Sequence, residues 1–202
     1  KATLVAPFID TAYYLIGNMN GWNTDALIKL NHSGADIYDD PVFSTIIEVP
    51  ADCYWKVIPQ INVTEGNVWN NNNVLGCEEN GNTDLTGKLV INPNPEPGAM
   101  RIENAGWVKI SLNMMDYTYT VELLGEVSPY LYTPGNHQNW TPATSVKLYS
   151  SDFMNYSGYL SLDGEFKFTS APDWDHTNYG DGGEGALSTA GGNLSVSKGF
   201  YY

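Results

Sequence analysis

One pattern occurs twice in this chain and decides how it folds: residues 12–23 read Ala-Tyr-Tyr-Leu-Ile-Gly-Asn-Met-Asn-Gly-Trp-Asn, and residues 129–141 read Pro-Tyr-Leu-Tyr-Thr-Pro-Gly-Asn-His-Gln-Asn-Trp-Thr. Each copy starts with a tyrosine-rich stretch typical of a strand and continues into a Gly-Asn turn. A tryptophan follows five residues after the glycine, and then a short apolar stretch ending in Lys-Leu. We infer an internal repeat.

Three further blocks recur in the same order. They pair Lys56 with Lys167, Trp69 with Trp174, and the Gly-aromatic step at Gly106 with that at Gly199. The offset between copies is 118 at the first Trp, 111 at the Lys, 105 at the second Trp and 93 at the last glycine. A fixed order with a shrinking offset indicates two homologous modules, of which the first carries longer loops.

The boundary between the modules is predicted in Gly125–Pro129, where a glycine and a proline bracket a short linker. The first module is therefore expected at residues 1–125 and the second at 126–202. Residues 199–202 read like the opening of a strand, so we expect the last strand of the second module to be missing from this chain.

The composition favours strands throughout. Only 16% of the residues are charged, 13% are aromatic, and the polar residues are largely Asn, Ser, Thr and Gly. Strands are predicted at 43–49, 107–112 and 117–123, and the prolines of 92–97 predict an extended loop. The fold class is all-β, with two tandem immunoglobulin-like or carbohydrate-binding-module-type antiparallel β-sandwiches.

The charge of the chain excludes two classes of partner. Its 23 Asp and Glu against nine Lys and Arg give a net charge of −14. A nucleic-acid partner needs a basic footprint, and an anionic lipid surface repels such a protein. Neutral polymers such as polysaccharides remain compatible partners.

Strand periodicity places both repeated lysines. In residues 53–57, the side chains of Cys53, Trp55 and Val57 share one face, and Lys56 points the other way. In the second copy, Phe166 and Phe168 share a face that Lys167 opposes. Because the apolar face is the core face, each lysine is expected on the outer face of its sheet.

Four tryptophans lie in turn-like segments between polar residues, and these are Trp22, Trp69, Trp140 and Trp174. A core tryptophan lies more often in an apolar run, and large exposed aromatic surface usually has a use. The flat face of an indole suits the C–H face of a pyranose. A lysine ammonium and an asparagine amide can then hydrogen-bond the sugar hydroxyls.

This pattern, Tyr-Leu-Ile-Gly-Asn-x-Asn-Gly-Trp followed by the lysine strand and the second Trp, resembles the SusE/SusF type of surface starch-binding lipoprotein. The resemblance covers both modules and implies non-catalytic binding of α-glucan such as starch or maltooligosaccharide. It also implies an outer-membrane, surface-exposed location with a lipid anchor outside this chain. Other outer-membrane glycan-uptake proteins are implied as further partners, and no cofactor is predicted.

Carried onto this chain, the family's carbohydrate-binding positions fall on matching residues of both modules. The predicted carbohydrate-binding residues are Trp140, Lys167, Trp174 and Asn178 in the second module, and Trp22, Lys56, Trp69 and Asn73 in the first. The first module departs from the pattern by an Asn-rich loop after Trp69, so the second site is ranked first.

Two other interpretations use the same residues. Asp173 and Asp175 flank Trp174 and suggest a glycosidase pair, but they lie in one loop, and Val68 and Asn70 occupy the matching positions. The alternative function is a structural or protein-interaction module of a glycan-uptake complex, whose aromatic hot spots would look similar. Cys53 and Cys77 are compatible with one disulfide or with two buried thiols.

Overall fold

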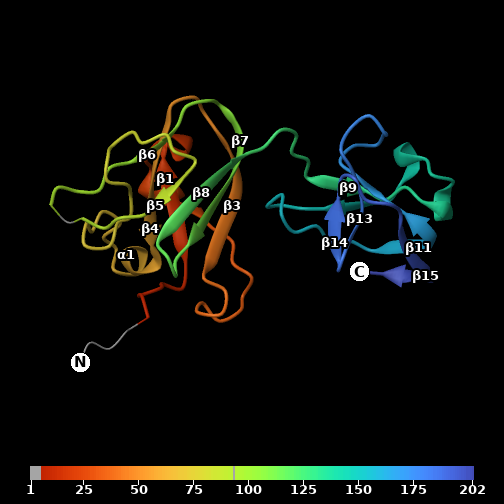
Figure 1. Cartoon of the computed structure of the whole chain (residues 1–202), viewed down its shortest axis with the longest axis horizontal. Helices are drawn as coiled ribbons and strands as arrows, with labels where there is room; N and C mark the ends of the chain where they lie inside the picture. Colours follow the sequence, from red (N-terminus) through yellow and green to blue (C-terminus); the bar gives the residue numbers. More distant parts are fainter. Residues whose placement is uncertain (1–5, 93) are drawn as a thin grey trace. The chain divides into compact units, whose positions relative to one another are not determined.

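The computed structural model describes residues 6–92 and 94–202 and consists almost entirely of antiparallel strands (Figure 1). The all-β prediction is confirmed. The chain divides into two compact units, residues 1–125 and 126–202. Residues 1–5 and Pro93, which fall in the first predicted module and its proline-rich loop, lie outside the described residues.

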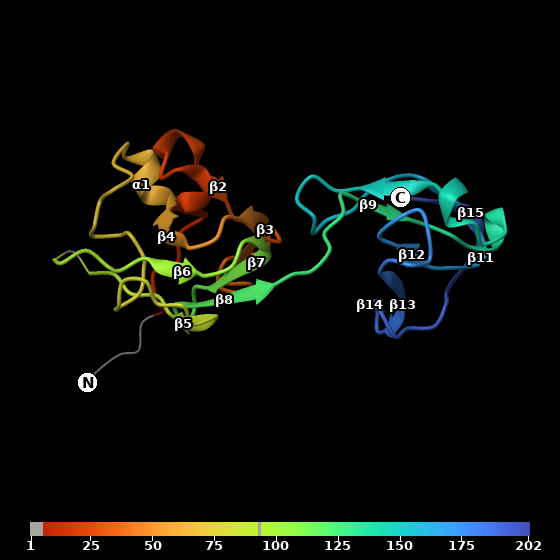
Figure 2. The ribbon, with the colours of Figure 1, turned by 90° about the horizontal axis from the view of Figure 1, so that it is seen from above.

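The first unit consists of two four-stranded sheets, which Figure 2 shows as separate layers. One sheet has the order β2-β1-β4-β6, with β2 at Ile28–Lys29, β1 at Tyr13–Gly17, β4 at Cys53–Pro59 and β6 at Met100–Ile102. The other has the order β3-β7-β8-β5, with β3 at Val42–Val49, β7 at Gly106–Asn113, β8 at Thr118–Leu123 and β5 at Thr86–Lys88.

The inner faces of these sheets form one core. The ring of Trp55 on β4 is fully buried and meets Tyr119 of β8 edge-on, with 5.6 Å between ring centroids. Cys53 and Val57 belong to the same core cluster, as strand periodicity predicts. Burial of each such side chain contributes about 1.5–3 kcal/mol. Cys53 and Cys77 are both buried free thiols.

The second unit contains a five-stranded and a two-stranded sheet. The five-stranded order is β10-β9-β12-β13-β14, with β10 at Lys147–Tyr149, β9 at Tyr130–Tyr132, β12 at Phe168–Thr169, β13 at Asn178–Gly183 and β14 at Ala186–Ser188. The two-stranded sheet pairs β11 at Leu160–Phe166 with β15 at Leu194–Tyr201. Its core contains Leu160, Leu162 and Phe166.

The strand registers of the two units repeat at the offsets read from the sequence. Gly17 opposes Trp55 in the first unit, and Gly135 opposes Phe166 in the second. Likewise, Tyr14 opposes Lys29, and Tyr132 opposes Lys147. The repeat therefore preserves hydrogen-bonded neighbours and not only residue types.

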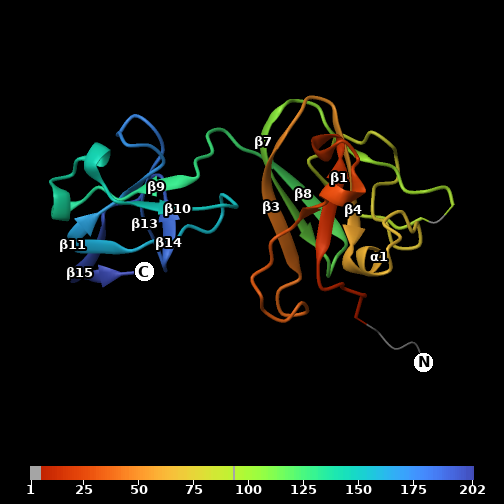
Figure 3. The ribbon, with the colours of Figure 1, turned by 180° about the vertical axis from the view of Figure 1, so that it is seen from behind.

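Two local features differ from expectation. The sequence suggested a strand opening at 199–202, whereas β15 already starts at Leu194, because Leu194 and Val196 pack on the core of the second unit. A short helix, α1 at Gln60–Thr64, follows β4 (Figure 3) and was not predicted. No helix among the described residues has the length and apolarity that a membrane span requires.

Candidate carbohydrate-binding sites

The first turn tryptophan is held at the end of β1. Gly17 approaches β4 so closely that a Cβ there would lie 2.2 Å from the carbonyl oxygen of Tyr54. A 3₁₀ turn at Asn18–Asn20 follows, and the Trp22 N–H donates to the Gly17 carbonyl at 2.8 Å. The indole Nε1–H donates to the Asn18 Oδ1 at 3.0 Å. These bonds orient the indole.

The second unit builds the same turn after β9. A Cβ on Gly135 would lie 2.5 Å from the Glu165 carbonyl oxygen. The Trp140 N–H donates to the Gly135 carbonyl at 2.9 Å, and its Nε1–H donates to the Asn136 Oδ1 at 2.7 Å. Trp22 and Trp140 share a backbone φ of 57°.

A second tryptophan completes each pair because the segment after it pairs with the residue that follows the repeated lysine. Leu75 bridges to Val57 in the first unit, as Tyr179 pairs with Phe168 in the second. The ring centroids of Trp22 and Trp69 lie 6.1 Å apart at an interplanar angle of 31°. Those of Trp140 and Trp174 lie 6.3 Å apart, also at 31°. The two pairs are nearly identical tilted platforms.

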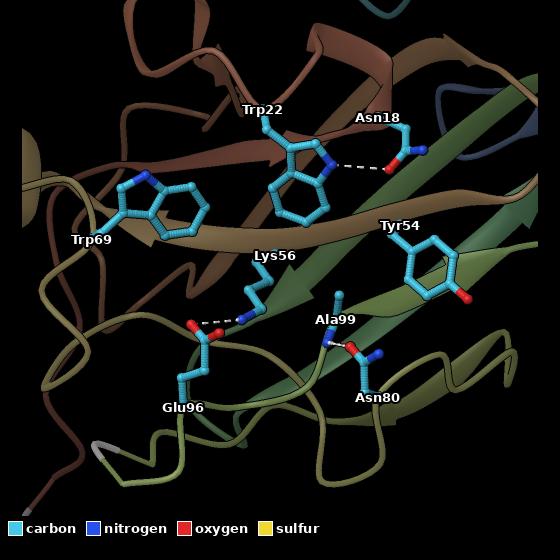
Figure 4. A pocket seen from close by; sticks show the side chains of 8 residues that line it. All are labelled: Asn18, Trp22, Tyr54, Lys56, Trp69, Asn80, Glu96 and Ala99. Carbon is cyan, nitrogen blue, oxygen red and sulfur yellow. Dashed lines mark hydrogen bonds and ion pairs between the residues drawn. The ribbon is translucent and has the colours of Figure 1, made fainter.

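The first platform opens onto a hollow of about 550 Å³. Figure 4 shows Trp22 and Trp69 on one side of it, Glu96 and Asn80 on the other, and Lys56 between them. Tyr54, Asn18 and Ala99 complete the lining. The Lys56 Nζ lies 3.2 Å from the Glu96 Oε2, and Lys56 is only 6% exposed. Lys56 thus faces away from the core, as its strand parity predicts, but is more buried than a surface lysine.

The second platform opens onto a hollow of about 410 Å³ lined by Trp140, Lys167, Trp174, Asn178 and Asn193. The Lys167 Nζ donates to the Gly191 carbonyl at 3.0 Å. The Asn178 Nδ2 donates to the carbonyls of Trp174 and His176, both at 3.1 Å. Its Oδ1 is buried and has no hydrogen-bond partner among the described residues. The Asn178 side chain thus lines the hollow and bonds the loop that carries Trp174, while its oxygen is enclosed.

The loop that carries Trp174 is closed by Asp173. One oxygen of this carboxylate accepts from the N–H groups of Asp175 and His176 and contacts the His176 Nδ1 at 2.6 Å. The hydrogen bond from His176 lowers the pKa of Asp173, and the same contact, with the charges of Asp173 and Glu126, raises the pKa of His176. The Asp173 carboxylate therefore has a structural role in the loop that carries Trp174.

Seven of the eight predicted residues line the two hollows. Asn73 does not: its Nδ2 donates to the Asn62 Oδ1 at 2.9 Å, and it lines a separate cavity with Tyr13 and Leu75. The buried Asn62 holds the Asn-rich loop together, since its Nδ2 also donates to the carbonyls of Val68 and Asn70. The asparagine run thus has a structural role at this position.

Sequence reasoning missed Asn18 and Asn136, although their place one residue after the repeated glycine was a usable signal. It also missed Glu96 and Asn193. Neither belongs to a repeated block, and both reach their hollows from loops distant in the sequence. Nothing in the local pattern identifies them.

The geometry can be compared with that of known proteins. Residues 8–123 match the family described as "SusF, first starch specific CBM". The crystal structure of SusF from Bacteroides thetaiotaomicron is similar, with a TM-score of 0.51 and 19% sequence identity over 96% of this chain and 46% of that chain. At that identity the likeness shows the fold alone, and this chain spans less than half of that protein. No curated protein sequence matches.

Proposed function

This chain belongs to the family of the first starch-specific carbohydrate-binding module of SusF, and from that premise we propose that it binds α-glucan at two sites, one in each unit. The family is one of starch-binding modules and not of enzymes, so the function is non-catalytic. The observation that carries the proposal of two sites is the repeated tryptophan pair, with the same 31° tilt in both units.

The tilt favours a curved polymer over a flat one. A pyranose presents an apolar C–H face that stacks on an aromatic ring, and its hydroxyl groups lie around the ring edge. In an α-1,4-glucan each residue is rotated relative to the last, so the chain curves, and successive residues fit two rings set at an angle. A β-1,4-glucan is flatter and does not match this platform.

The polar residues beside the rings supply the hydroxyl contacts. The ammonium groups of Lys56 and Lys167 donate, and Asn178 lines the second hollow beside Lys167. Asn73 is left out of this proposal because its amide is bonded to Asn62. We also propose that the protein lies at the outer-membrane surface beside other glycan-uptake proteins, which its family membership supports.

Affinity electrophoresis of the full chain in gels containing starch, pullulan, β-glucan or mannan tests the proposal. We expect the α-glucans alone to retard the protein, and Trp22→Ala and Trp174→Ala each to reduce the retardation. Loss of one ring platform costs about 1.4 kcal/mol or about tenfold in affinity at its site.

The matched control is Phe200→Ala, because Phe200 is 91% exposed and lines neither hollow. It should migrate like the parent. Free migration of the parent in every α-glucan gel, or full retardation of the Trp22→Ala/Trp174→Ala double variant, would refute the proposed function.

A further inference from the structure

Another aromatic pair lies on the outer face of the five-stranded sheet in the second unit. On β9 and β10, which are neighbouring strands (Figure 3), Tyr130 opposes Tyr149. Their ring centroids lie 5.7 Å apart at an interplanar angle of 51°. The Lys147 Nζ lies 3.8 Å from the centroid of the Tyr130 ring, and Tyr149 is 54% exposed. Leu131 and Leu148, which alternate with these residues, face the core, so the two tyrosines face outward.

The shared fold does not require this tyrosine pair. At the offset of 118 that relates the first tryptophans, Tyr130 matches Ala12 and Tyr149 matches Asn31, although β1 pairs with β2 as β9 pairs with β10. In the first unit Ala12 is buried, and its carbonyl accepts from the N–H of Gln60, the first residue of α1. No second α-helix occurs among the described residues, so no such helix covers the matching place in the second unit. The tyrosine pair is therefore a feature of the second unit alone.

A row of opposed residues connects this pair to the second hollow. Lys147 opposes Tyr132 of β9, which in turn opposes Thr169 of β12. Thr169 opposes Asn178 of β13, and Asn178 lines the second hollow. Directly opposed residues share one face of a sheet, and three strand spacings amount to about 14 Å. The tyrosine pair and the hollow thus lie on the same face, at a separation that a polymer can span.

The chemistry of the pair matches a neutral pyranose polymer. A phenol ring stacks on the apolar C–H face of a pyranose, and its hydroxyl group reaches the polar edge. Lys147 contacts ring faces and forms no ion pair among the described residues, so its ammonium group can donate to sugar hydroxyls. The net charge of −14 disfavours an anionic polymer. The glucan proposed for the second hollow therefore also suits the tyrosine pair.

We propose that Tyr130, Tyr149 and Lys147 form an accessory site for polymeric α-glucan, which contacts a polymer already held at the second hollow. The inference rests on the proposed function, because the second hollow supplies the first contact. Two linked contacts strengthen the binding of a ligand that reaches both and leave the binding of a shorter ligand unchanged. The accessory site therefore favours the polymer over short oligosaccharides.

A comparison of a short with a long ligand tests this site. The protein is the full chain carrying Trp22→Ala, which makes the second unit the reporter. Calorimetry measures maltotriose, which covers the tryptophan pair without extending to the tyrosines, and affinity electrophoresis over a range of concentrations measures soluble starch. We expect added Tyr149→Asn, which introduces the residue of the first unit, to weaken starch binding by about fivefold, as for loss of one stacked ring. Maltotriose binding should stay within about twofold, and Tyr130→Ala should behave in the same way.

Tyr159→Ala is the matched control. Tyr159 is 82% exposed and pairs with Tyr202 at 4.9 Å between ring centroids, but it lies beside the β11–β15 sheet. This substitution should leave both affinities unchanged. The melting temperature of the Tyr149→Asn chain should equal that of the Trp22→Ala chain, because the Tyr149 ring is exposed.

Undiminished starch binding by the Tyr149→Asn and Tyr130→Ala chains, or an equal loss of maltotriose binding, would overturn the accessory site and leave the proposed function standing. If the Trp22→Ala chain binds neither ligand, the second site of the proposed function fails, and the accessory site fails with it.

Discussion

Trp22 and Trp140 adopt a left-handed backbone conformation, which costs a residue with a Cβ about 1–2 kcal/mol. Each is held there by its own N–H, which donates to the carbonyl of the glycine five residues earlier, and by its indole N–H, which donates to an asparagine. The same strained conformation at both matching positions points to use of the ring, and Trp22 also packs with its buried part on Ile16, Ile58 and Val74. The asparagine fixes the direction in which the ring faces.

Loss of that asparagine should therefore weaken binding without unfolding the unit. We expect Asn18→Ala, in the Trp174→Ala chain, to reduce affinity for maltoheptaose by about fivefold, because one hydrogen bond of about 1 kcal/mol no longer orients the indole. Titration calorimetry measures the effect. Asn72→Ala, at an exposed asparagine of the neighbouring turn, should change nothing, and an equal loss there would show that the orienting bond is irrelevant.

Individual residues were predictable where the repeat marks them. The four turn tryptophans and the two lysines follow from their recurrence and from strand parity. Asn73 was chosen from its neighbourhood in the sequence, and only its bond to the buried Asn62 shows why it points elsewhere. Glu96 was not predictable, because its contact with Lys56 joins residues that are forty apart in the chain.

The turn after β1 and after β9 is the element that sets each platform. Gly17 and Gly135 make this turn possible because they let the chain pass close to the neighbouring backbone. Their own backbone is extended, a conformation that any residue can adopt. The requirement is one of space, since a methyl group would collide with a carbonyl oxygen at either position.

Gly135→Ala should consequently push the turn after β9 away from Glu165 and Phe166 of β11. We expect a loss of about 1–3 kcal/mol in the stability of the second unit, together with loss of binding at its site. Thermal unfolding and titration of the Trp22→Ala chain measure the two effects. Gly125→Ala is the control, because a Cβ there meets nothing within 4 Å. An undiminished second site in the Gly135→Ala protein would contradict this account of the turn.

The loop that carries Trp174 should respond to pH. The raised pKa of His176 means that its bond to Asp173 is at full strength below the ordinary histidine value of 6.5 and is lost as pH rises through the raised value. The lowered pKa of Asp173 means that its contribution is present above its ordinary value of 3.8 and is lost as pH falls through the lowered one. Glu126 and Asp175 also favour protonated His176.

The Trp22→Ala chain should thus bind maltoheptaose best at about pH 5–6.5 and about twofold to threefold more weakly near pH 9, a modest change because the pair is exposed. Titrations across this range measure it. His176→Gln should flatten the alkaline side of the profile, whereas His32→Gln in the first unit should not. A profile that His176→Gln leaves unchanged would exclude the loop as its source.

At the level of elements, alternation of side chains identified the core face of β4 correctly because both faces are chemically distinct. Helix α1 was not predicted because a backbone N–H group of its first turn is bonded by a residue distant in the sequence: the Ile61 N–H donates to the Asp10 Oδ2 at 2.7 Å. The extent of β15 was not predicted, because its apolar residues pack on β11 and no local sequence pattern specifies that packing.

For the whole molecule, the repeat is the feature that connects sequence, fold and function. The registers beside Lys56 on β4 and beside Lys167, which lies between β11 and β12, recur at the offsets visible in the sequence. Each unit also carries a tryptophan pair of the same geometry. The sheets beyond that shared region differ between the units. The repeated sequence blocks therefore predicted which residues gather around each hollow better than they predicted the full architecture of the second unit.

The number of maltoheptaose molecules bound by the full chain, measured by isothermal titration calorimetry, tests the central claim most directly. Two independent platforms predict two molecules per chain; either Trp22→Ala or Trp174→Ala should leave one site of parental affinity and one about tenfold weaker, and both together should leave weak binding only. One molecule per chain in the parent, or loss of all binding after a single substitution, would contradict the claim that each unit carries its own site.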